Sequence, residues 1–239
     1  MCSLVLELQG LVKHFPVASG EPVRAVDGVS LAVAHGELLA LYGPSGSGKT
    51  TLLMLIAALL EPDAGRVMLD GREVSAFSAR ESARYRLLDL GFVRQSPNLI
   101  PGADVLDNAA LKLMGTEVGA REARRRVGPL LDRLGLAERA SHRPEQLSMG
   151  ERQRVMVARA LSTDPKLVLA DEPTGSLDTQ RGDEVLGLLA EVCRERGVSV
   201  VLVTHDPQAA WYADRVHALR DGRLVDHEPG RAFAPVDAK

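Results

Sequence analysis

Gly43-Pro44-Ser45-Gly46-Ser47-Gly48-Lys49-Thr50 is the stretch that decides the fold of this 239-residue chain. It follows the apolar run Leu38 to Tyr42, which is typical of a strand buried on both faces of a parallel sheet. The apolar segment after it, up to Leu60, predicts a buried helix. The pattern G-x-x-x-x-G-K-[ST] between a buried strand and a helix is that of a phosphate-binding loop. The sequence therefore predicts an α/β fold with a P-loop nucleotide site.

The residue types of this loop suit the binding of nucleotide phosphates. Its glycines let successive backbone N–H groups converge on one anion, and the following helix presents the positive end of its dipole to the same point. Lys49 supplies positive charge for the β and γ phosphates, and the Thr50 hydroxyl is an oxygen ligand suited to Mg²⁺. The predicted nucleotide-binding residues of this segment are Gly43, Pro44, Ser45, Gly46, Ser47, Gly48, Lys49, Thr50 and Thr51.

The composition of the chain narrows the classes of function. Thirty-two acidic residues against 29 Lys and Arg give a formal net charge of −3, whereas nucleic-acid binding faces are usually basic. Cys2 and Cys193 have neither disulfide-framework nor zinc-ligand spacing. The longest apolar run, Leu52 to Leu60, is shorter than the roughly 20 residues that a membrane helix needs. We expect a soluble chain with no secretory signal, no nucleic-acid partner and no membrane span, so that a membrane role would come through a partner.

The order of patterns along the chain predicts its domain organisation. Leu4 to Leu8 and Val29 to Val33 read as strands, and turns at 62–65 and Asp70-Gly71 flank a short antiparallel strand at 66–69. The middle of the chain is charged and has helical periodicity, and buried strands return after Lys166. We predict one α/β domain over residues 1–228: a P-loop NTPase core with a mostly parallel sheet, an antiparallel β subdomain and an inserted helical subdomain at about 78–150. Residues 229–239 are expected to form a flexible tail.

Two carboxylates end the buried strand that begins at Lys166, in the run Lys166-Leu167-Val168-Leu169-Ala170-Asp171-Glu172. An acidic pair after a strand is weak evidence for a functional site by itself, because strand ends are often polar. Downstream of a phosphate-binding loop, however, Mg²⁺ needs a second anchor, which Asp171 would supply. Glu172 is then in position to act as general base toward an attacking water.

Leu147-Ser148-Met149-Gly150-Glu151 predicts the start of a helix. Ser148 and Glu151 have the spacing of a capping box, which explains the segment without any function. A capped helix start with a glycine in its first turn is also an anion site. The two interpretations, a helix cap and an anion site, are compatible with each other.

These segments taken together resemble the ATP-binding cassette (ABC) family. The family's signature reads LSGGQ, before a helix rich in glutamine and arginine, and the matching residues here are Ser148, Gly150, Gln153 and Arg154. Met149 replaces a glycine of the signature, and Glu151 replaces its glutamine. The remaining family motifs follow in order: Phe15 for the aromatic that stacks on adenine, Gln95 for the Q-loop, Ser176-Leu177-Asp178 for the D-loop and His205 for the switch histidine.

The resemblance implies an ATPase that works as a pair of cassettes, in which the P-loop of one and the signature of the other enclose each ATP. It implies catalytic roles for Lys49, Gln95, Glu172 and His205, and Mg²⁺ contacts for Thr50, Gln95 and Asp171. Further nucleotide contacts are expected from Phe15, Ser148, Gly150 and Asp178. The implied cofactors are ATP and Mg²⁺. The implied partners are a second cassette, as a homodimer, and an integral membrane permease that holds the chain at the cytoplasmic face of the membrane.

The segment from Ser75 to Gln95 is similar to the branch that serves lipoprotein release, macrolide export and cell division (the LolD, MacB and FtsE group), although Arg94 departs from the apolar residue often found there. Leu99 and Ile100 either dock a cytoplasmic helix of the permease or anchor the helix expected after Asp104 to its own core. The alternatives to a transporter ATPase are a non-transport ABC ATPase acting on nucleic acid or ribosomes, and a P-loop kinase or GTPase. The sequence does not identify the substrate or the direction of transport.

Overall fold

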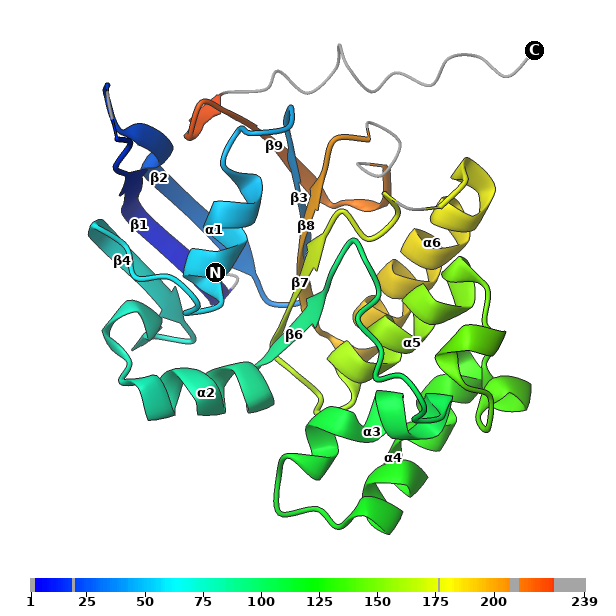
Figure 1. Ribbon diagram of the computed structural model, residues 1–239. Coiled ribbons are helices and arrows are strands. Elements are labelled where there is room, and N and C mark those ends of the chain that lie inside the picture. Colours follow the sequence, from blue (N-terminus) through cyan, green and yellow to red (C-terminus); the bar gives the residue numbers. More distant parts are fainter. Residues whose placement is uncertain (1–2, 19, 176, 207–210, 226–239) are drawn as a thin grey trace, which may run out of the picture.

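The computed structural model describes residues 3–18, 20–175, 177–206 and 211–225. Figure 1 shows a central sheet with an antiparallel sheet on one side of it and a layer of helices on the other. The central sheet has the strand order β10-β9-β3-β8-β7-β6. Its strands are β3 (Leu38–Tyr42), β6 (Leu90–Val93), β7 (Leu167–Asp171), β8 (Ser199–Thr204), β9 (Arg215–Arg220) and β10 (Arg223–Val225). All neighbours pair in parallel except β10 with β9.

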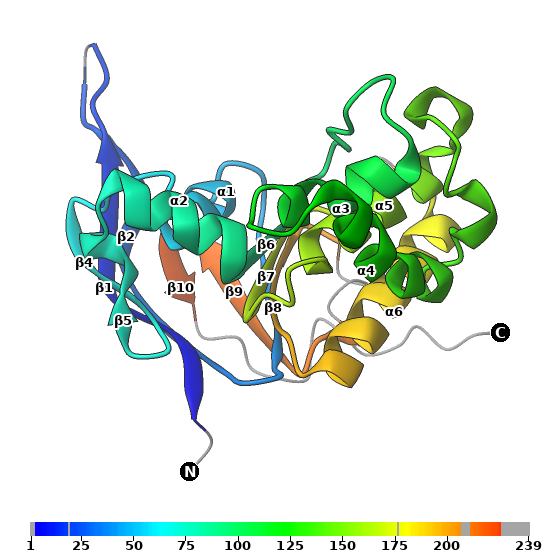
Figure 2. The ribbon, with the colours of Figure 1, turned by 90° about the horizontal axis from the view of Figure 1, so that it is seen from below.

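The three middle strands are buried on both faces, as continuous apolar runs predict. Side chains alternate between the faces, so each strand feeds two hydrophobic clusters. Leu167 and Leu169 enter one cluster with the apolar residues of α1 (Lys49–Ile56). Val168 and Ala170 enter the other cluster with those of α5 (Met149–Leu161). The helix after the phosphate loop and the helix after Ser148 therefore cover opposite faces of the sheet, and Figure 2 shows them on its two sides.

The antiparallel sheet has the order β2-β1-β4-β5. Its strands are β1 (Leu4–Phe15), β2 (Val23–Ala34), β4 (Ala64–Leu69) and β5 (Arg72–Glu73). The predicted turn at Asp70-Gly71 joins β4 to β5, with positive φ at both residues. Buried side chains of β1, β2 and β4 pack into the same cluster as α1, which ties this sheet to the nucleotide-binding side of the molecule.

The helical layer covers the other face of the central sheet and extends beyond it (Figure 2). Its α-helices are α3 (Val105–Met114), α4 (Ala120–Arg133), α5 and α6 (Thr179–Arg196), with short 3₁₀ helices at Ala137–Arg139 and Pro144–Gln146. Val127 and Leu131 of α4 are buried in it. Arg124, Arg125 and Arg126 of α4 lie off that face and pair with Asp107 and Glu122, as a solvated helix surface does.

The predicted start of the helical insertion, near residue 78, falls at a helix that packs on the nucleotide-binding side of the molecule. A third 3₁₀ helix (Val74–Ala76) leads into α2 (Ala79–Leu88), whose Tyr85 is buried in the α1 cluster and donates a 2.8 Å hydrogen bond to Ile56 O. The next strand, β6, returns to the edge of the central sheet beside β7. Helical periodicity at residues 79–88 does not reveal which core a helix packs on, so the sequence grouped α2 and β6 with the insertion. The predicted tail, 229–239, lies outside the described residues. None of the helices among the described residues is long and apolar enough to cross a membrane.

Candidate nucleotide site

The phosphate loop lies between β3 and α1, wedged against the antiparallel sheet and β9. Gly48 precedes α1 at φ 101°, and a Cβ there would approach Ala25 O to 1.9 Å. A Cβ on Gly43 would approach Leu219 O to 2.2 Å. Only glycine fits these two positions, because one needs a left-handed conformation and both lie against a neighbouring backbone. The loop is therefore held in place from both sides, with the start of α1 open toward a ligand.

Lys49 is 5% exposed, yet its ammonium group pairs with no carboxylate of the described residues. Nζ donates to Gly43 O at 2.7 Å and to Pro44 O at 2.9 Å, and among the described residues no carboxylate lies within ion-pair distance of it. Burial lowers the pKa of Lys49, while the charges of Glu172 and Asp171 oppose that shift. A buried cation with neutral acceptors, at the start of a helix and inside a glycine loop, fits the phosphates of a nucleotide.

Asp171 ends β7 opposite the first turn of α1. The Thr50 hydroxyl donates a 3.4 Å hydrogen bond to Asp171 Oδ1. Burial raises the pKa of Asp171 most, and the Glu172 charge adds to it, whereas the Thr50 hydrogen bond and the positive charges of Lys49 and Arg94 lower it. The two oxygens are the ligand type that Mg²⁺ takes together with nucleotide phosphates.

Glu172 and His205 follow adjacent parallel strands, β7 and β8, whose carboxyl ends meet at one edge of the sheet. His205 Nδ1 lies 3.0 Å from Glu172 Oε1. Glu172 has a φ of 46°, which is strained for a residue with a side chain, and its N–H donates to Val203 O at 2.9 Å. The Glu172 carboxylate is only 18% exposed, against 55% for the His205 ring. The carboxylate is thus held in a fixed place while the ring faces solvent.

Two other predicted residues lie at the borders of this edge. The Gln95 side chain lies against Gly175 in the loop after Glu172, where an added Cβ would meet Gln95 Nε2 at 2.6 Å. Phe15 is the last residue of β1 and pairs with Val23, two residues before the Ala25 carbonyl that touches Gly48. The fold brings predicted site residues that are far apart along the chain to one end of the central sheet. These residues are Phe15, Lys49, Thr50, Gln95, Asp171, Glu172 and His205.

The segment after Leu147 lies apart from this edge, on the helix that packs on the other face of the sheet. Ser148 caps α5: its Oγ accepts from Glu151 N at 3.2 Å, and Glu151 Oε2 accepts from Ser148 N at 2.8 Å. A Cβ on Gly150 would meet only Arg181 Cδ, at 3.9 Å. Asp178 caps α6 by accepting from Arg181 N, which explains it as a helix start, and Ser176 lies outside the described residues. The structure does not bring Ser148 and Gly150 to the P-loop of the same chain.

The sequence profile of the ABC transporter family matches residues 26–175, more than half of the chain. The chain belongs to the ABC transporter family. This ABC cassette is 46% identical to the lipoprotein-releasing system ATP-binding protein LolD 2 of Caulobacter vibrioides, over 94% of this chain and 98% of that protein. It is 43% identical to the macrolide export ATP-binding/permease protein MacB 1/2 of Paracoccus denitrificans, over 92% of this chain and 33% of that longer protein.

Solved structures of ABC cassettes have the same fold. The dimeric structure of the bacterial ABC transporter cassette MJ0796 matches with a TM-score of 0.83 and 36% identity, over 92% of this chain and 96% of that one. A second dimeric structure of that cassette, in a post-hydrolysis state with ADP and Pi, matches with a TM-score of 0.82. The predicted family, the α/β fold and the ATPase activity are confirmed, which removes the P-loop kinase and GTPase alternative.

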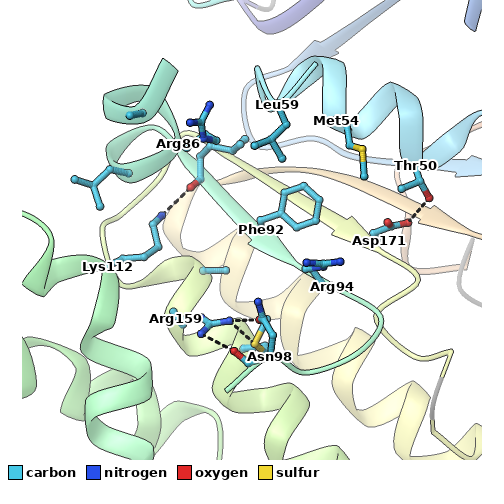
Figure 3. A pocket seen from close by; sticks show the side chains of 15 residues that line it. Thr50, Met54, Leu59, Arg86, Phe92, Arg94, Asn98, Lys112, Arg159 and Asp171 are labelled. Carbon is cyan, nitrogen blue, oxygen red and sulfur yellow. Dashed lines mark hydrogen bonds between the residues drawn. The ribbon is translucent and has the colours of Figure 1, made fainter. Parts of the chain in front are cut away.

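The cassette also has a groove that the sequence analysis did not find. Its cavity volume is about 560 Å³, and it runs from Thr50 and Asp171, along β6, to the helical layer (Figure 3). Arg94, between Phe92 and Asn98 on its wall, was visible in the sequence as a departure from the family pattern, but its surroundings were not. Leu99 packs on the core of the helical layer, and Ile100 is 43% exposed. The interpretation of Leu99 as a core anchor thus fits the structure.

Proposed function

We propose that this cassette binds Mg-ATP in a composite site formed with a second copy of itself, and that hydrolysis drives a membrane permease. One observation carries the proposal: the phosphate loop and the start of α5 are two anion sites on helices that cover opposite faces of one sheet. A single ATP cannot contact both within one chain. A head-to-tail pair would bring the start of α5 from one copy to the P-loop of the other, twice, by two-fold symmetry.

Within one copy, the glycine loop and Lys49 hold the phosphates, and Thr50, Asp171 and Gln95 would hold Mg²⁺. The cation, when bound, neutralises charge that develops on the transferred phosphoryl group. Glu172, fixed by its backbone bond to Val203, accepts the proton of the attacking water. His205, 3.0 Å from that carboxylate, orients it and reaches the γ-phosphate from the solvent side. Phe15 would stack on the adenine.

The second copy supplies donors at the start of its α5. The Ser148 hydroxyl accepts from Glu151 N, so its own hydrogen is free to be donated to a γ-phosphate oxygen. The first N–H groups of the helix point the same way, and the lack of a side chain at Gly150 lets the phosphate approach them. Asp178, exposed at the start of α6, is proposed to contact the partner.

The relatives' names support a permease partner of the lipoprotein-releasing or macrolide-export type. The MacB relative carries the permease on the same chain, whereas the LolD relative has nearly the length of this one. We propose that the permease is a separate chain, that it holds the cassette at the cytoplasmic face of the membrane, and that it docks at the groove in Figure 3. That groove reaches Thr50 and Asp171, so a docked segment would sense the nucleotide.

The test uses a tagged Glu172→Gln variant, in which the amide keeps the shape of the side chain and cannot accept a proton. We expect ATP binding to persist, hydrolysis to fall by about 10² to 10⁴-fold, and an ATP-dependent dimer to accumulate in light scattering. From detergent-solubilised membranes of cells that make both proteins, the variant should retain an integral membrane protein in Mg-ATP. Retention of ribosomes or nucleic acid alone would instead support the non-transport ABC ATPase.

A further inference from the structure

Arg94 brings a positive charge to the end of the groove where Thr50 and Asp171 lie. Side chains at the end of β6 alternate between the faces of the sheet: Phe92 packs on the cluster of α1, and Val93 belongs to the cluster of α5. Arg94 follows β6 and continues the side of Phe92, and both line the groove together with Thr50 and Asp171 (Figure 3). The chain therefore has a cation on the nucleotide side of the sheet, where the family pattern often has an apolar residue.

The guanidinium of Arg94 is exposed and forms no hydrogen bond or ion pair with the described residues. The other cations that line the groove donate to backbone carbonyls, and these pairs are Arg86 with Ala58, Lys112 with Leu90 and Arg159 with Asn98. The backbone of Arg94 is held by α5, because the buried Gln153 donates from Nε2 to Arg94 O at 2.9 Å. Arg94 thus combines a fixed backbone with a charge that is free to act on a ligand.

The charge of Arg94 reaches the carboxylates of the nucleotide site. Burial raises the pKa of Asp171, and the positive charges of Lys49 and Arg94 act against that shift. Lys49, Asp171 and Glu172 together carry one more negative than positive charge, and Arg94 brings this sum to zero. The negative charge of a nucleotide grows with each phosphate, so a site that lacked Arg94 would disfavour ATP more than it disfavours ADP.

We propose that Arg94 is a specificity-determining residue of the nucleotide site, whose charge favours ATP over ADP by acting on the γ-phosphate from the groove side. The inference rests on the proposed function, because it takes the P-loop and Asp171 of this chain as the ATP site. Lys49 is buried within the glycine loop and serves the β and γ phosphates together, so its charge discriminates less between the two nucleotides. Arg94 lies at the end where Thr50 and Asp171 would hold the metal beside the terminal phosphate.

The same charge should act on Mg²⁺ with the opposite sign. A cation near Thr50 and Asp171 repels a second cation, so the loss of Arg94 should strengthen Mg²⁺ binding in the ATP complex while it weakens ATP binding. By linkage, the loss of ATP affinity should then be larger in EDTA than in Mg²⁺. A structural role of Arg94 in the fold would weaken both ligands alike, so the two signs separate an electrostatic role from a structural one.

The experiment measures displacement of a fluorescent ADP analogue from the purified full chain, in EDTA and in Mg²⁺. The competitors are ADP and an ATP analogue with an uncleavable β–γ bond, at a protein concentration where light scattering shows a monomer. In EDTA, Arg94→Gln should weaken binding of the ATP analogue by about threefold to tenfold, the size expected for one partly screened charge, and should change ADP binding by less than about twofold. The loss should be smaller in Mg²⁺ and should shrink with added salt. Arg94→Lys, which keeps the charge, should bind both nucleotides as the wild type does.

The control is Arg84→Gln, which removes an exposed cation from α2, outside the groove, and should leave both affinities unchanged. Melting temperatures show that each variant is folded. Equal losses for the two nucleotides, equal losses in EDTA and in Mg²⁺, or an unreduced ATP affinity in Arg94→Gln would each overturn the inference. Lys49→Ala tests the proposed function separately, since it should lose binding of both nucleotides. If Lys49→Ala binds them as the wild type does, the proposed function itself falls; if only Arg94→Gln does so, the proposed function stands and this inference is wrong.

Discussion

The two helix starts proposed to bind the nucleotide phosphates differ in how completely this chain encloses them. The start of α1 has a left-handed glycine and no side-chain cap, and it lies against β2, β9 and the carboxyl edge of the central sheet. The start of α5 has a capping box formed by Ser148 and Glu151; Met149 there is 38% exposed, and Gly150 is buried, with only Arg181 Cδ, at 3.9 Å, near the place that a Cβ would take. The first site leaves its N–H groups free for a ligand and provides the cation and the carboxylates. The second provides only donors, which is what one expects of half a site that a second copy completes.

The largest expected effect comes from mixing two inactive variants, each altered at a different one of the two helix starts. Lys49→Ala removes the buried cation of the first site, and Gly150→Asp puts a carboxylate at the second, where the lack of close neighbours lets it fit. Each variant alone should lose ATPase activity by about 10² or more, as expected when a main electrostatic contact of phosphoryl transfer is lost. In a mixed dimer both defects fall in one site and the other site is intact. We expect an equal mixture to recover about a quarter of wild-type activity, because half of the dimers are mixed and two-fold symmetry gives each one good site.

The control for that experiment is the folded state of the Gly150→Asp variant. An acidic residue in the first turn stabilises a helix, so its melting temperature should not fall. An equal mixture that stays inactive, from two folded variants that bind each other, would show that both contacts belong to the same chain.

The second effect concerns the carboxylate that replaces the signature glutamine. Burial raises the pKa of Glu151, but hydrogen bonds from Ser148 and Arg139 outweigh it and keep the pKa low, so the group is charged beside the proposed anion site. Arg139 Nε pairs with it at 2.9 Å. In the Glu172→Gln background, Arg139→Gln should weaken ATP-dependent dimerisation by about tenfold, through repulsion between the bare carboxylate and phosphate. Adding Glu151→Gln should restore it. A double variant as weak as Arg139→Gln alone would show that Arg139 only stabilises the fold.

The third effect uses a matched pair of helix caps. Ser78 and Ser148 start α2 and α5 with the same capping box and nearly identical backbone angles. Ser78→Ala and Ser148→Ala should each cost about 1 kcal/mol of stability in chemical denaturation. Only Ser148→Ala should also lower ATPase activity, because only that hydroxyl is proposed to reach the partner's nucleotide. An equal loss of activity in both variants would show that Ser148 acts only as a helix cap.

The smallest effect concerns the link between the helical layer and the sheet. Lys112 joins α3 to the start of β6 and to Thr163 after α5, and burial lowers its pKa from 10.5 to about 8. Between pH 8 and 10.5 the unfolded chain therefore holds a proton that the folded chain has released. The free energy of unfolding should rise with pH over this window relative to Lys112→Met, which has no such proton. Parallel denaturation curves at pH 8 and 10 give the difference, and identical pH profiles would show that Lys112 titrates normally.

Local patterns in the sequence predicted much of the fold and named the candidate residues. The buried run Leu38 to Tyr42 and the glycine loop after it require a strand, a turn and a helix, because no other local structure satisfies both the apolar periodicity and the glycines. The hairpin at Asp70-Gly71 followed from turn chemistry in the same way. The roles of the candidate residues stay predictions.

The sequence by itself determined which chemical groups are available for binding and catalysis. Only the tertiary structure decided which of these groups lie next to one another. Strand order decides that Glu172 and His205 share an edge, because β7 and β8 are neighbours in the sheet. The alternation of side chains decides that α1 and α5 cover opposite faces, which is the basis for proposing a site shared by two copies. The groove arises where β6 returns to the sheet between α2 and the helical layer, so that Arg86, Arg94, Lys112 and Arg159 face a common space. Such contacts depend on packing between distant segments, and spacing along the chain does not encode them locally.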